Sequence, residues 1–350
     1  MPQRTATRQN LTNPSLIFLT TMLLWRLPSG ERNMAMRIRS GMIAAVLALS
    51  FPFKAMAWWD EGHMQIAAVA YERLSPQIRE KADVLIRLNP EYQNWVAGVP
   101  DRLKPQYAFV RAAVWADDIK SLVAGYTDEG DTAASPTAGR NIGYVDSFKH
   151  TYWHFKDIPY FVEGMTEADT DPVNLETQIV SLRDGLSATS GLPDSVRSYD
   201  LVWLLHLVGD AHQPLHATAL VSKAFKKGDQ GGNSIVVTPA NGQTVKLHAY
   251  WDGIFGGYST PYGAIEDGLL DKNIKLPEPD AARAAISDPA EWLKESRQKA
   301  IDFVYVAPVG FDKGPYVLDR TYETNARNVA REQAAVAAAR LANLITAALK

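Results

Sequence analysis

The stretch SYDLVWLLHLVGDAH, residues 198–212, decides the class of the fold. Its large apolar residues lie three and four positions apart, which is the spacing of side chains on one face of an α-helix. The same spacing relates His206 to Asp210, so both polar side chains point the same way from the predicted helix. The stretch therefore predicts a helix that carries an imidazole and a carboxylate side by side.

Similar apolar spacing recurs along the chain after residue 57. We expect further helices at these places: two within residues 62–88, separated at Ser75-Pro76, and one each within 173–190, 288–305 and 325–350. Asn241-Gly242 between alternating runs predicts a short β-hairpin over residues 233–248. Residues 121–148 and 254–287 are rich in Gly, Pro and Asp, which is typical of loops. The predicted fold is mainly α, a single compact helical domain over 58–350 with one short β-hairpin.

Composition restricts the kinds of site that the chain can carry. Its 350 residues are 46% hydrophobic and 21% charged, which is typical of a globular protein. The formal net charge of −3 excludes a global basic field that would attract nucleic acid, so a polyanionic substrate needs local cations. The absence of cysteine excludes disulfides and thiolate zinc sites. A metal ion would have to be held by His, Asp and Glu.

The first 57 residues have the features of an export leader. Residues 36–57 combine a basic start at Arg37 and Arg39, an apolar stretch, and Ala55-Met56-Ala57, which has the A-x-A form of a signal-peptidase site. We therefore expect residues 34–57 to be a secretory signal peptide and residues 1–33 an upstream extension. The mature chain would be exported, periplasmic or secreted, without a membrane anchor. The alternatives are a genuine 57-residue leader or an N-terminal anchor.

Histidines and aspartates share a spacing that favours a metal site. His248 and Asp252 repeat the spacing of His206 and Asp210, and His216 follows the predicted helix end at Pro214. One such pair alone indicates a structural role more often than a ligand set. Two pairs, together with His216 and a histidine close to the expected mature terminus, favour a metal site. Imidazole and carboxylate ligands without thiolate suit Zn²⁺ at a hydrolytic centre.

Several short motifs in order carry a resemblance to a known family. They are WWDEGH (58–63), VWADDIK (114–120), WHFKD (153–157), LVWLLHLVGDAHQPLH (201–216), GGN (231–233), LHAYWD (247–252) and WLKES (292–296). With them the chain resembles the zinc-dependent type I nucleases, the nuclease S-one and nuclease P-one family. The resemblance implies a mainly α domain with three Zn²⁺ ions at the base of a cleft. It also implies hydrolysis of single-stranded DNA and RNA to 5′-phosphates, with 3′-nucleotidase activity.

The resemblance assigns a ligand set to the three zinc ions. Trp58, through its α-amino nitrogen and carbonyl oxygen, and His63 match the ligands of one ion, and Asp210 matches a carboxylate that bridges this ion and the next. The remaining matches are Asp117, His154 and His206 for the second ion and His216, His248 and Asp252 for the third. His150 and His212 are not ligand positions in the family pattern. We expect His150 on the surface or behind the ligands.

Other matches concern the reaction and the substrate. Asp117 and Lys120 match catalytic positions, the carboxylate orienting the nucleophile and the lysine meeting charge on the phosphoryl group. The matches for substrate binding are Phe155 for base stacking, Asp157 for the base edge, and Gly232 and Asn233, together with Gly231, for a loop beside the nucleoside. The residue types alone also allow Lys120 to be a solvated lysine and Phe155 a core residue. Three lysines between residues 223 and 227 either contact a phosphate backbone or solvate a loop.

Two departures and two rival functions complete the prediction. Fungal and plant members carry disulfides and glycans, and this chain has neither, so we expect a bacterial member. One rival is a zinc-dependent phospholipase C, which shares a similar ligand set, and the other is an exported zinc-binding protein without turnover. WADDIK, HFKD and GGN favour the nuclease, acting on single-stranded DNA, RNA and 3′-nucleotides. We expect a monomer without a stable protein partner.

Overall fold

The computed structural model describes residues 58–168, 170–256 and 260–350. These residues belong to the second of two units into which the chain divides, residues 53–350. The predicted extension and signal peptide lie outside the described residues. The helices are α1 (Asp60–Arg73), α2 (Pro76–Ile86), α3 (Tyr92–Trp95), α4 (Lys104–Ala112), α5 (Trp115–Asp118), α6 (Leu175–Leu186), α7 (Asp194–Asp210), α8 (Leu247–Asp252), α9 (Pro261–Ile265), α10 (Ala281–Ala284), α11 (Pro289–Lys299) and α12 (Arg320–Leu349).

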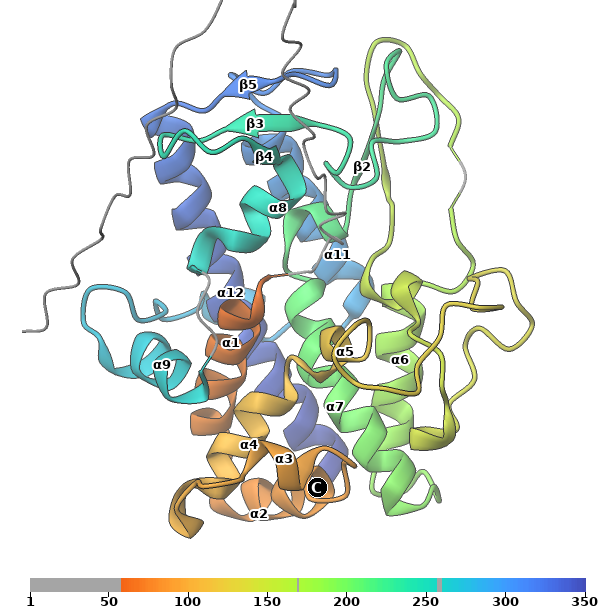
Figure 1. The fold of residues 1–350 in the computed structure, drawn as a ribbon, viewed down its shortest axis with the longest axis vertical. Coiled ribbons are helices and arrows are strands. Elements are labelled where there is room, and N and C mark those ends of the chain that lie inside the picture. The colour runs from red at the N-terminus through yellow and green to blue at the C-terminus, as the bar shows by residue number, and fades with distance from the viewer. Residues whose placement is uncertain (1–57, 169, 257–259) are drawn as a thin grey trace, which may run out of the picture. The chain divides into compact units, whose positions relative to one another are not determined.

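Helix α7, built by the stretch 198–212, lies at the centre of the helical layer in Figure 1. Every residue from Ser198 to Asp210 is buried, because α6, α2, α1 and α12 all pack against this helix. Burial of a helix on all sides requires apolar residues around its whole circumference, which Leu, Val and Trp supply. The mainly α fold is confirmed.

A local signal places the break between α1 and α2 where the sequence predicts it. Ser75 caps α2, its hydroxyl accepting a hydrogen bond from the backbone of Ile78, so the predicted break at Ser75-Pro76 is confirmed. Asn174 and Thr177 form a capping box at the start of α6. The helix predicted over 288–305 is α11 followed by a π-helical turn at Ala300–Val304. Region 254–287 is not only loop, because it contains α9, a π-helical turn and α10, which are too short to show a period.

Short strands form two small sheets. The predicted hairpin is present as β3 (Val236–Thr238) antiparallel to β4 (Val245–Lys246), with Asn241-Gly242 in the connecting loop. A strand not predicted from the sequence, β5 (Tyr316–Val317), pairs in parallel with β3. The second sheet, also not predicted, pairs β1 (Pro159–Phe161) in parallel with β2 (Ala219–Val221). Strands of two or three residues are too short for the alternation that identifies a strand.

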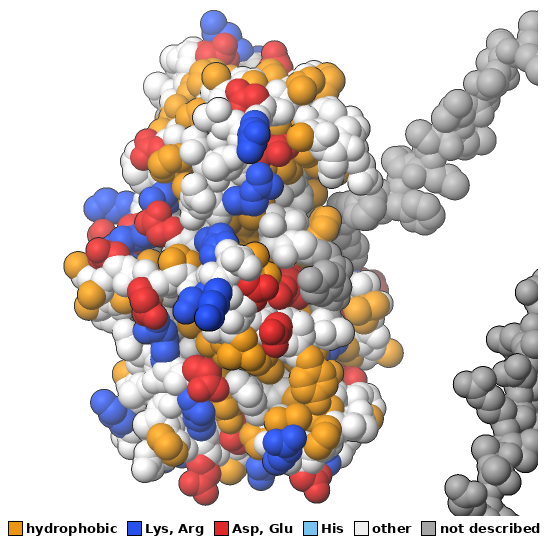
Figure 2. Space-filling view, turned by 90° about the vertical axis from the view of Figure 1, so that its left-hand side faces the viewer, with side chains coloured by type: hydrophobic (Ala, Val, Ile, Leu, Met, Phe, Trp, Pro, Cys, Tyr) orange, Lys and Arg blue, Asp and Glu red, His pale blue; other side chains and the backbone are white. Residues whose placement is uncertain are grey.

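Aromatic side chains fill the core between the helices. Among the residues that the structure describes, six tryptophans are fully buried: Trp58, Trp115, Trp153, Trp203, Trp251 and Trp292. On the surface, the face shown in Figure 2 mixes basic, acidic and hydrophobic side chains. Within the described residues, no helix combines the length and apolar character needed to cross a membrane.

Candidate active site

The last turns of α7 present two polar side chains to a buried cluster. His206 Nε2 lies 3.3 Å from Asp210 Oδ2, and neither side chain is exposed. His206 Nδ1 donates a hydrogen bond to the carbonyl oxygen of Ala113 (2.7 Å), which fixes the tautomer and turns Nε2 toward the cluster. The helical spacing read from the sequence therefore brings both groups together as predicted.

His63 enters the cluster from the first turn of α1. Its ring stacks on that of His206 with centroids 3.8 Å apart, and its Nε2 lies 3.3 Å from Asp210 Oδ1. Gly209 makes this approach possible, because a Cβ atom at that position would lie 2.7 Å from His63 Nδ1. Sequence reasoning missed the role of Gly209, although a glycine inside a helical pattern often marks a close packing contact.

Two further residues complete this side of the cluster. His154, at the end of a short 3₁₀ helix, places Nδ1 3.0 Å from Asp210 Oδ2 and 3.1 Å from His206 Nε2. Asp117, on α5, places Oδ1 3.7 Å from His206 Nε2 and 3.9 Å from His154 Nδ1. Residues separated by more than ninety positions in the chain thus meet at one point.

A separate group forms around α8. His216 Nε2 and His248 Nε2 are 3.1 Å apart, and His248 Nε2 lies 3.3 Å from Asp252 Oδ2. The other ring nitrogens donate to backbone carbonyls, His216 Nδ1 to residue 154 and His248 Nδ1 to residue 231, both at 2.6 Å. Gln213 donates to Asp252 Oδ1 (2.7 Å). This amide orients the carboxylate, and the sequence had not indicated that role.

The donor set fits bound divalent cations. Three groups each have ligand atoms within 4.8 Å of one another: His63, Asp117 and His206; His154, His206 and Asp210; His216, His248 and Asp252. Buried polar atoms are normally hydrogen-bonded, yet several here have no such partner. They are both ring nitrogens of His63, Asp117 Oδ2, His154 Nε2, Asp210 Oδ1 and Asp252 Oδ2. Orphaned lone pairs on imidazole and carboxylate are what a metal such as zinc would satisfy.

Charges inside the cluster favour the protonation states that bind metal. Burial opposes ionisation of Asp117, but the Lys120 ammonium 2.6 Å away and the nearby imidazoles hold its pKa below the usual range. Burial lowers the pKa of His63 to about 4, helped by His206. Burial and the charge of Lys120 lower the pKa of His154 to about 3. Neutral imidazoles and an ionised carboxylate are the forms that ligate metal.

Two groups depart from this pattern. Burial opposes protonation of His206, but Asp210 and Asp117 beside it raise its pKa. Burial raises the pKa of Asp252 well above its usual value, although Gln213 opposes the shift. A bound cation would reverse both tendencies, because nearby positive charge favours the carboxylate and the neutral imidazole.

Residues 58 and 59 are hydrogen-bonded both to the end of α7 and to the end of α8. The indole nitrogen of Trp58 donates to the carbonyl oxygen of Gly209 (3.1 Å), and the backbone N–H of Trp59 donates to that of Asp252 (2.9 Å). The Trp58 side chain is fully buried and meets Phe255 edge to face at 5.1 Å. At the point where the sequence predicts the mature terminus, the chain therefore runs beside the candidate ligand Asp252 and beside Gly209, which directly precedes the candidate ligand Asp210.

The remaining pair of histidines lies outside the cluster. His150 is fully buried, stacked on Trp153 with centroids 3.8 Å apart and placed 3.0 Å from Asp146 and 3.4 Å from Asp131. The prediction of a surface position for His150 is wrong. The alternative, a position behind the candidate ligands, stays a prediction. His212 donates through Nδ1 to the Val208 carbonyl, and its Nε2 accepts from the buried guanidinium of residue 340.

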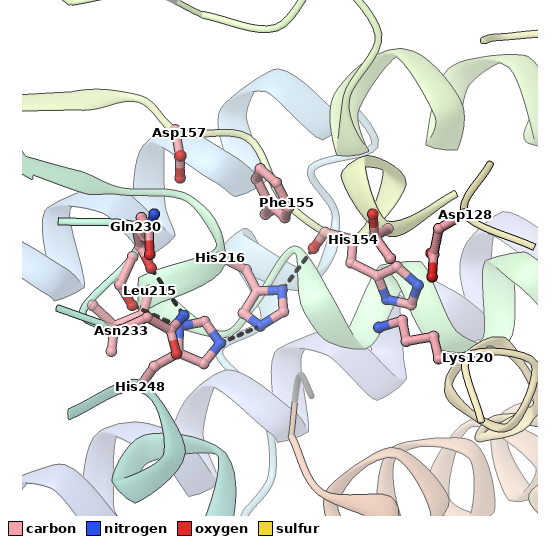
Figure 3. A pocket seen from close by; sticks show the side chains of 12 residues that line it. Lys120, Asp128, His154, Phe155, Asp157, Leu215, His216, Gln230, Asn233 and His248 are labelled. Carbon is pink, nitrogen blue, oxygen red and sulfur yellow. Dashed lines mark hydrogen bonds between the residues drawn. The ribbon is translucent and has the colours of Figure 1, made fainter. Parts of the chain in front are cut away.

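A cavity of about 510 Å³ opens onto the cluster (Figure 3). Its lining consists of Lys120, Asp128, Thr151, His154, Phe155, Asp157, Leu215, His216, Gln230, Gly231, Asn233 and His248. Figure 3 shows Lys120 and Asp128 on one side and Gln230 and Asn233 on the other. Of the residues that the resemblance matches to substrate binding, Phe155, Asp157, Gly231 and Asn233 line this cavity and Gly232 does not. Asp128, Thr151 and Gln230 were not predicted.

A buried carboxylate holds the glycine loop. Asp229 accepts hydrogen bonds from the backbone N–H groups of Leu220 and Gly232, both at 2.9 Å, and from the Tyr305 hydroxyl at 2.8 Å. Burial raises the pKa of Asp229 to about 7 against the effect of these donors. Gly231 has φ +57°, and a Cβ atom there would lie 2.5 Å from the Leu215 carbonyl oxygen. Asp229 thus positions the loop whose carbonyl oxygen at residue 231 accepts from His248.

Comparison with known proteins agrees with this geometry. The family model described as S1/P1 Nuclease matches residues 58–350. Nuclease S1 of Aspergillus oryzae (strain ATCC 42149 / RIB 40) is 29% identical over 238 residues, 66% of this chain and 67% of that protein. Endonuclease 3 of Arabidopsis thaliana is 24% identical over 231 residues, 63% of this chain and 61% of that protein. Because the family model covers the whole described part of the chain, the protein belongs to the S1/P1 nuclease family.

Proposed function

We propose that the protein hydrolyses phosphodiester bonds of single-stranded DNA and RNA to 5′-phosphates and also acts as a 3′-nucleotidase. One observation carries the proposal: the cavity that opens onto the His/Asp groups is also lined by a lysine and a partly buried aromatic ring, Lys120 and Phe155. Orphaned ligand atoms, a cation for phosphate and an aromatic surface for a base are the three parts that such a reaction needs.

Three Zn²⁺ ions are proposed as the cofactors. Trp58, His63 and Asp210 would hold one ion, Asp117, His154, His206 and Asp210 a second, and His216, His248 and Asp252 a third. When bound, zinc supplies a water-derived nucleophile near neutral pH and neutralises charge on the phosphoryl and departing oxygens. The orphaned atoms of His63, His154, Asp117, Asp210 and Asp252 support this assignment.

Protein groups orient the reacting phosphate in this proposal. Lys120 Nζ lies 2.6 Å from Asp117 Oδ1 and lines the cavity, so its three donors reach both the carboxylate and a phosphoryl oxygen beside it. The lysine is 7% exposed, and this burial strengthens its attraction for an anion relative to a solvated lysine. The carboxylate of Asp117, held beside Lys120 at the cavity, is proposed to orient the attacking water as well as to bind zinc.

Single-strand preference follows from the aromatic side chain in the cavity. Phe155 offers a flat surface on which any base can stack, but only a base that has left a duplex stack can reach it. Asp157 and Asn233 line the same cavity and offer an acceptor and an amide to the base edge. Burial raises the pKa of Asp157 to about 6.

The proposed terminal ligand explains the position of the leader. Cleavage after Ala57 would free the α-amino group of Trp58, whereas an uncleaved chain has an amide there, which is a poor ligand. The hydrogen bonds from Trp58 to Gly209 and from Trp59 to Asp252 support a terminus placed beside the metals. A chain starting at Trp58 should bind about three zinc ions per chain, and one with an added N-terminal residue about one fewer.

One experiment tests the function as a whole. The chain starting at Trp58 is loaded with zinc and incubated with single-stranded DNA, RNA, duplex DNA, a 3′-mononucleotide and phosphatidylcholine vesicles. We expect cleavage of the first two, release of phosphate from the mononucleotide, and little cleavage of the duplex. Release of phosphocholine without nucleic-acid cleavage would establish the phospholipase C alternative, and zinc binding without any turnover would refute an enzyme.

A further inference from the structure

A two-stranded arm extends from the rim of the cavity. We call residues 159–164 and 219–228 the basic arm. Its first segment starts two residues after Asp157 and its second ends two residues before Gln230, and both of these residues line the cavity. Register pairs Pro159 with Ala219 and Phe161 with Val221, so β1 and β2 run side by side in the same direction. A strand bound in the cavity that continues past Asp157 and Gln230 would therefore meet this arm.

The turn at the end of β2 presents three lysines. Lys223, Lys226 and Lys227 are exposed, and none forms an ion pair or a side-chain hydrogen bond within the described residues. The turn itself is held in place, because Ser222 Oγ accepts from the backbone of residues 224 and 225. Phe225 between the lysines is buried in a hydrophobic cluster. The three ammonium groups are thus carried by an anchored turn.

Aromatic and basic residues from a distant segment adjoin the same turn. Ser222 Oγ donates to the carbonyl oxygen of Phe311 (2.8 Å), which places the loop before β5 against the arm. Phe311 and Lys313 on that loop are exposed, as is Phe161 on β1. Exposed rings interleaved with cations are the combination by which proteins hold single-stranded nucleic acid, since rings stack on bases and cations contact phosphates.

The acidic side chains of the region are mostly engaged. Glu163 Oε2 accepts from the backbone N–H of Lys223 (2.8 Å), and Asp312 accepts from the Tyr316 hydroxyl and the backbone of Gly314. A carboxylate that already accepts from protein donors competes less for a lysine ammonium. The lysines therefore remain available to an external anion.

We infer that the basic arm binds the phosphates of a single-stranded polynucleotide on one side of the nucleotide held in the cavity. This inference rests on the proposed nuclease function. Lys223 lies four residues after the start of β2 and Lys227 three residues before Gln230, and none of the three lysines lines the cavity. Because the three lysines are not part of the cavity lining, a mononucleotide whose base lies on Phe155 can occupy the cavity without contacting them. The arm therefore affects long substrates and leaves mononucleotides unaffected.

The test compares two substrates in one enzyme. The variant Lys223→Gln/Lys226→Gln/Lys227→Gln, loaded with zinc, is assayed on a long single-stranded DNA and on a 3′-mononucleotide across a series of salt concentrations. We expect kcat/KM for the long strand to fall by about tenfold at low salt, and its logarithmic salt slope to decrease by about 2, since each lysine that neutralises a phosphate contributes about 0.7. Activity on the mononucleotide should not change.

A matched variant separates the arm from general surface charge. Lys272→Gln/Lys275→Gln/Lys294→Gln removes three exposed lysines elsewhere and should leave both activities and the salt slope as in the unmodified chain. An equal loss in both triple variants, an equal loss on both substrates, or an unchanged salt slope would overturn the inference. If the unmodified enzyme cleaves neither substrate, the proposed function fails instead, and the two failures are distinguishable.

Discussion

Replacing Gly209 with alanine tests how the candidate metal cluster is packed. In an ordinary helix this change adds about 1 kcal/mol of stability, because glycine is the less favourable residue. In α7 the new Cβ atom would lie 2.7 Å from His63 Nδ1 and 3.0 Å from Cε1, where ordinary contacts need about 3.5–4.0 Å. The ring cannot retreat freely, because it is fully buried and stacked on His206 at 3.8 Å. His63 must move by roughly 1 Å, the difference between these distances.

The cost should appear in both stability and metal content. Overpacking of a buried site costs about 1–3 kcal/mol, which outweighs the gain in helix propensity. We therefore expect Gly209→Ala to lower the free energy of unfolding in the presence of chelator by up to about 2 kcal/mol, the overpacking cost less the gain in helix propensity. Displacement of His63 should also remove about one zinc per chain, measured by elemental analysis, because an imidazole ligand displaced by this much loses its bonding distance.

A second glycine provides the matched control. A Cβ atom at Gly268 would meet its nearest neighbour, the Gln65 carbonyl oxygen, at 3.4 Å, which is ordinary contact. Gly268→Ala should therefore keep its full zinc content and be at least as stable as the unmodified chain. The reasoning is refuted if Gly209→Ala binds as much zinc as Gly268→Ala and unfolds at the same denaturant concentration.

Three other predictions follow from particular side chains. Lys120→Met should lower kcat about 10²–10³-fold with zinc content unchanged, and loss of zinc would show a structural role instead. Phe155→Ala should weaken binding of single-stranded substrate by about 1–3 kcal/mol, seen in KM, and an unchanged KM would place the ring in the core. Burial raises the pKa of Asp200 to about 8 against the hydrogen bond from Asn141. Its protonated form stabilises the fold fully below pH about 4, and this contribution is lost as pH rises toward 8. Asp200→Asn should therefore equal the unmodified chain at pH 4 and exceed its stability at pH 8, and identical pH profiles in urea unfolding would contradict this.

Long periodic segments made most of the fold predictable. α7 and α12 are 17 and 30 residues long and rich in apolar residues, and Ser75 marks a helix start by a side-chain hydrogen bond that depends only on neighbours. β1 and β2 were missed because each has three residues and their pairing joins positions sixty residues apart. A parallel pair of that length gains its stability from the surrounding packing, which no local pattern records.

In the candidate site, too, local spacing could be read from the sequence, whereas long-range contacts could not. His206 with Asp210 and His248 with Asp252 are one helical turn apart, so spacing alone brings each pair together. Asp229 acts through a loop that it reaches only in the folded chain, and its bond to Tyr305 spans 76 positions. No sequence spacing distinguishes such orienting groups from the many aspartates and glutamates that lie on protein surfaces. The sequence therefore indicates ligand candidates more readily than the residues that aim them.

Glycines beside the candidate ligands mark how closely the backbone must approach. Gly62 precedes His63, Gly209 precedes Asp210, and Gly231 lies two positions before Asn233. Added Cβ atoms would lie 2.8 Å from Trp58 Cβ, 2.7 Å from His63 Nδ1 and 2.5 Å from the Leu215 carbonyl oxygen, respectively. Each of these contacts is within or against the cluster, so a larger residue at any of the three would separate elements that carry ligand candidates. Imidazoles and carboxylates from several elements can pack this closely because the neighbouring positions carry no side chain. Glycine provides this at the centre of EGH, at the centre of VGD and at the start of GGN.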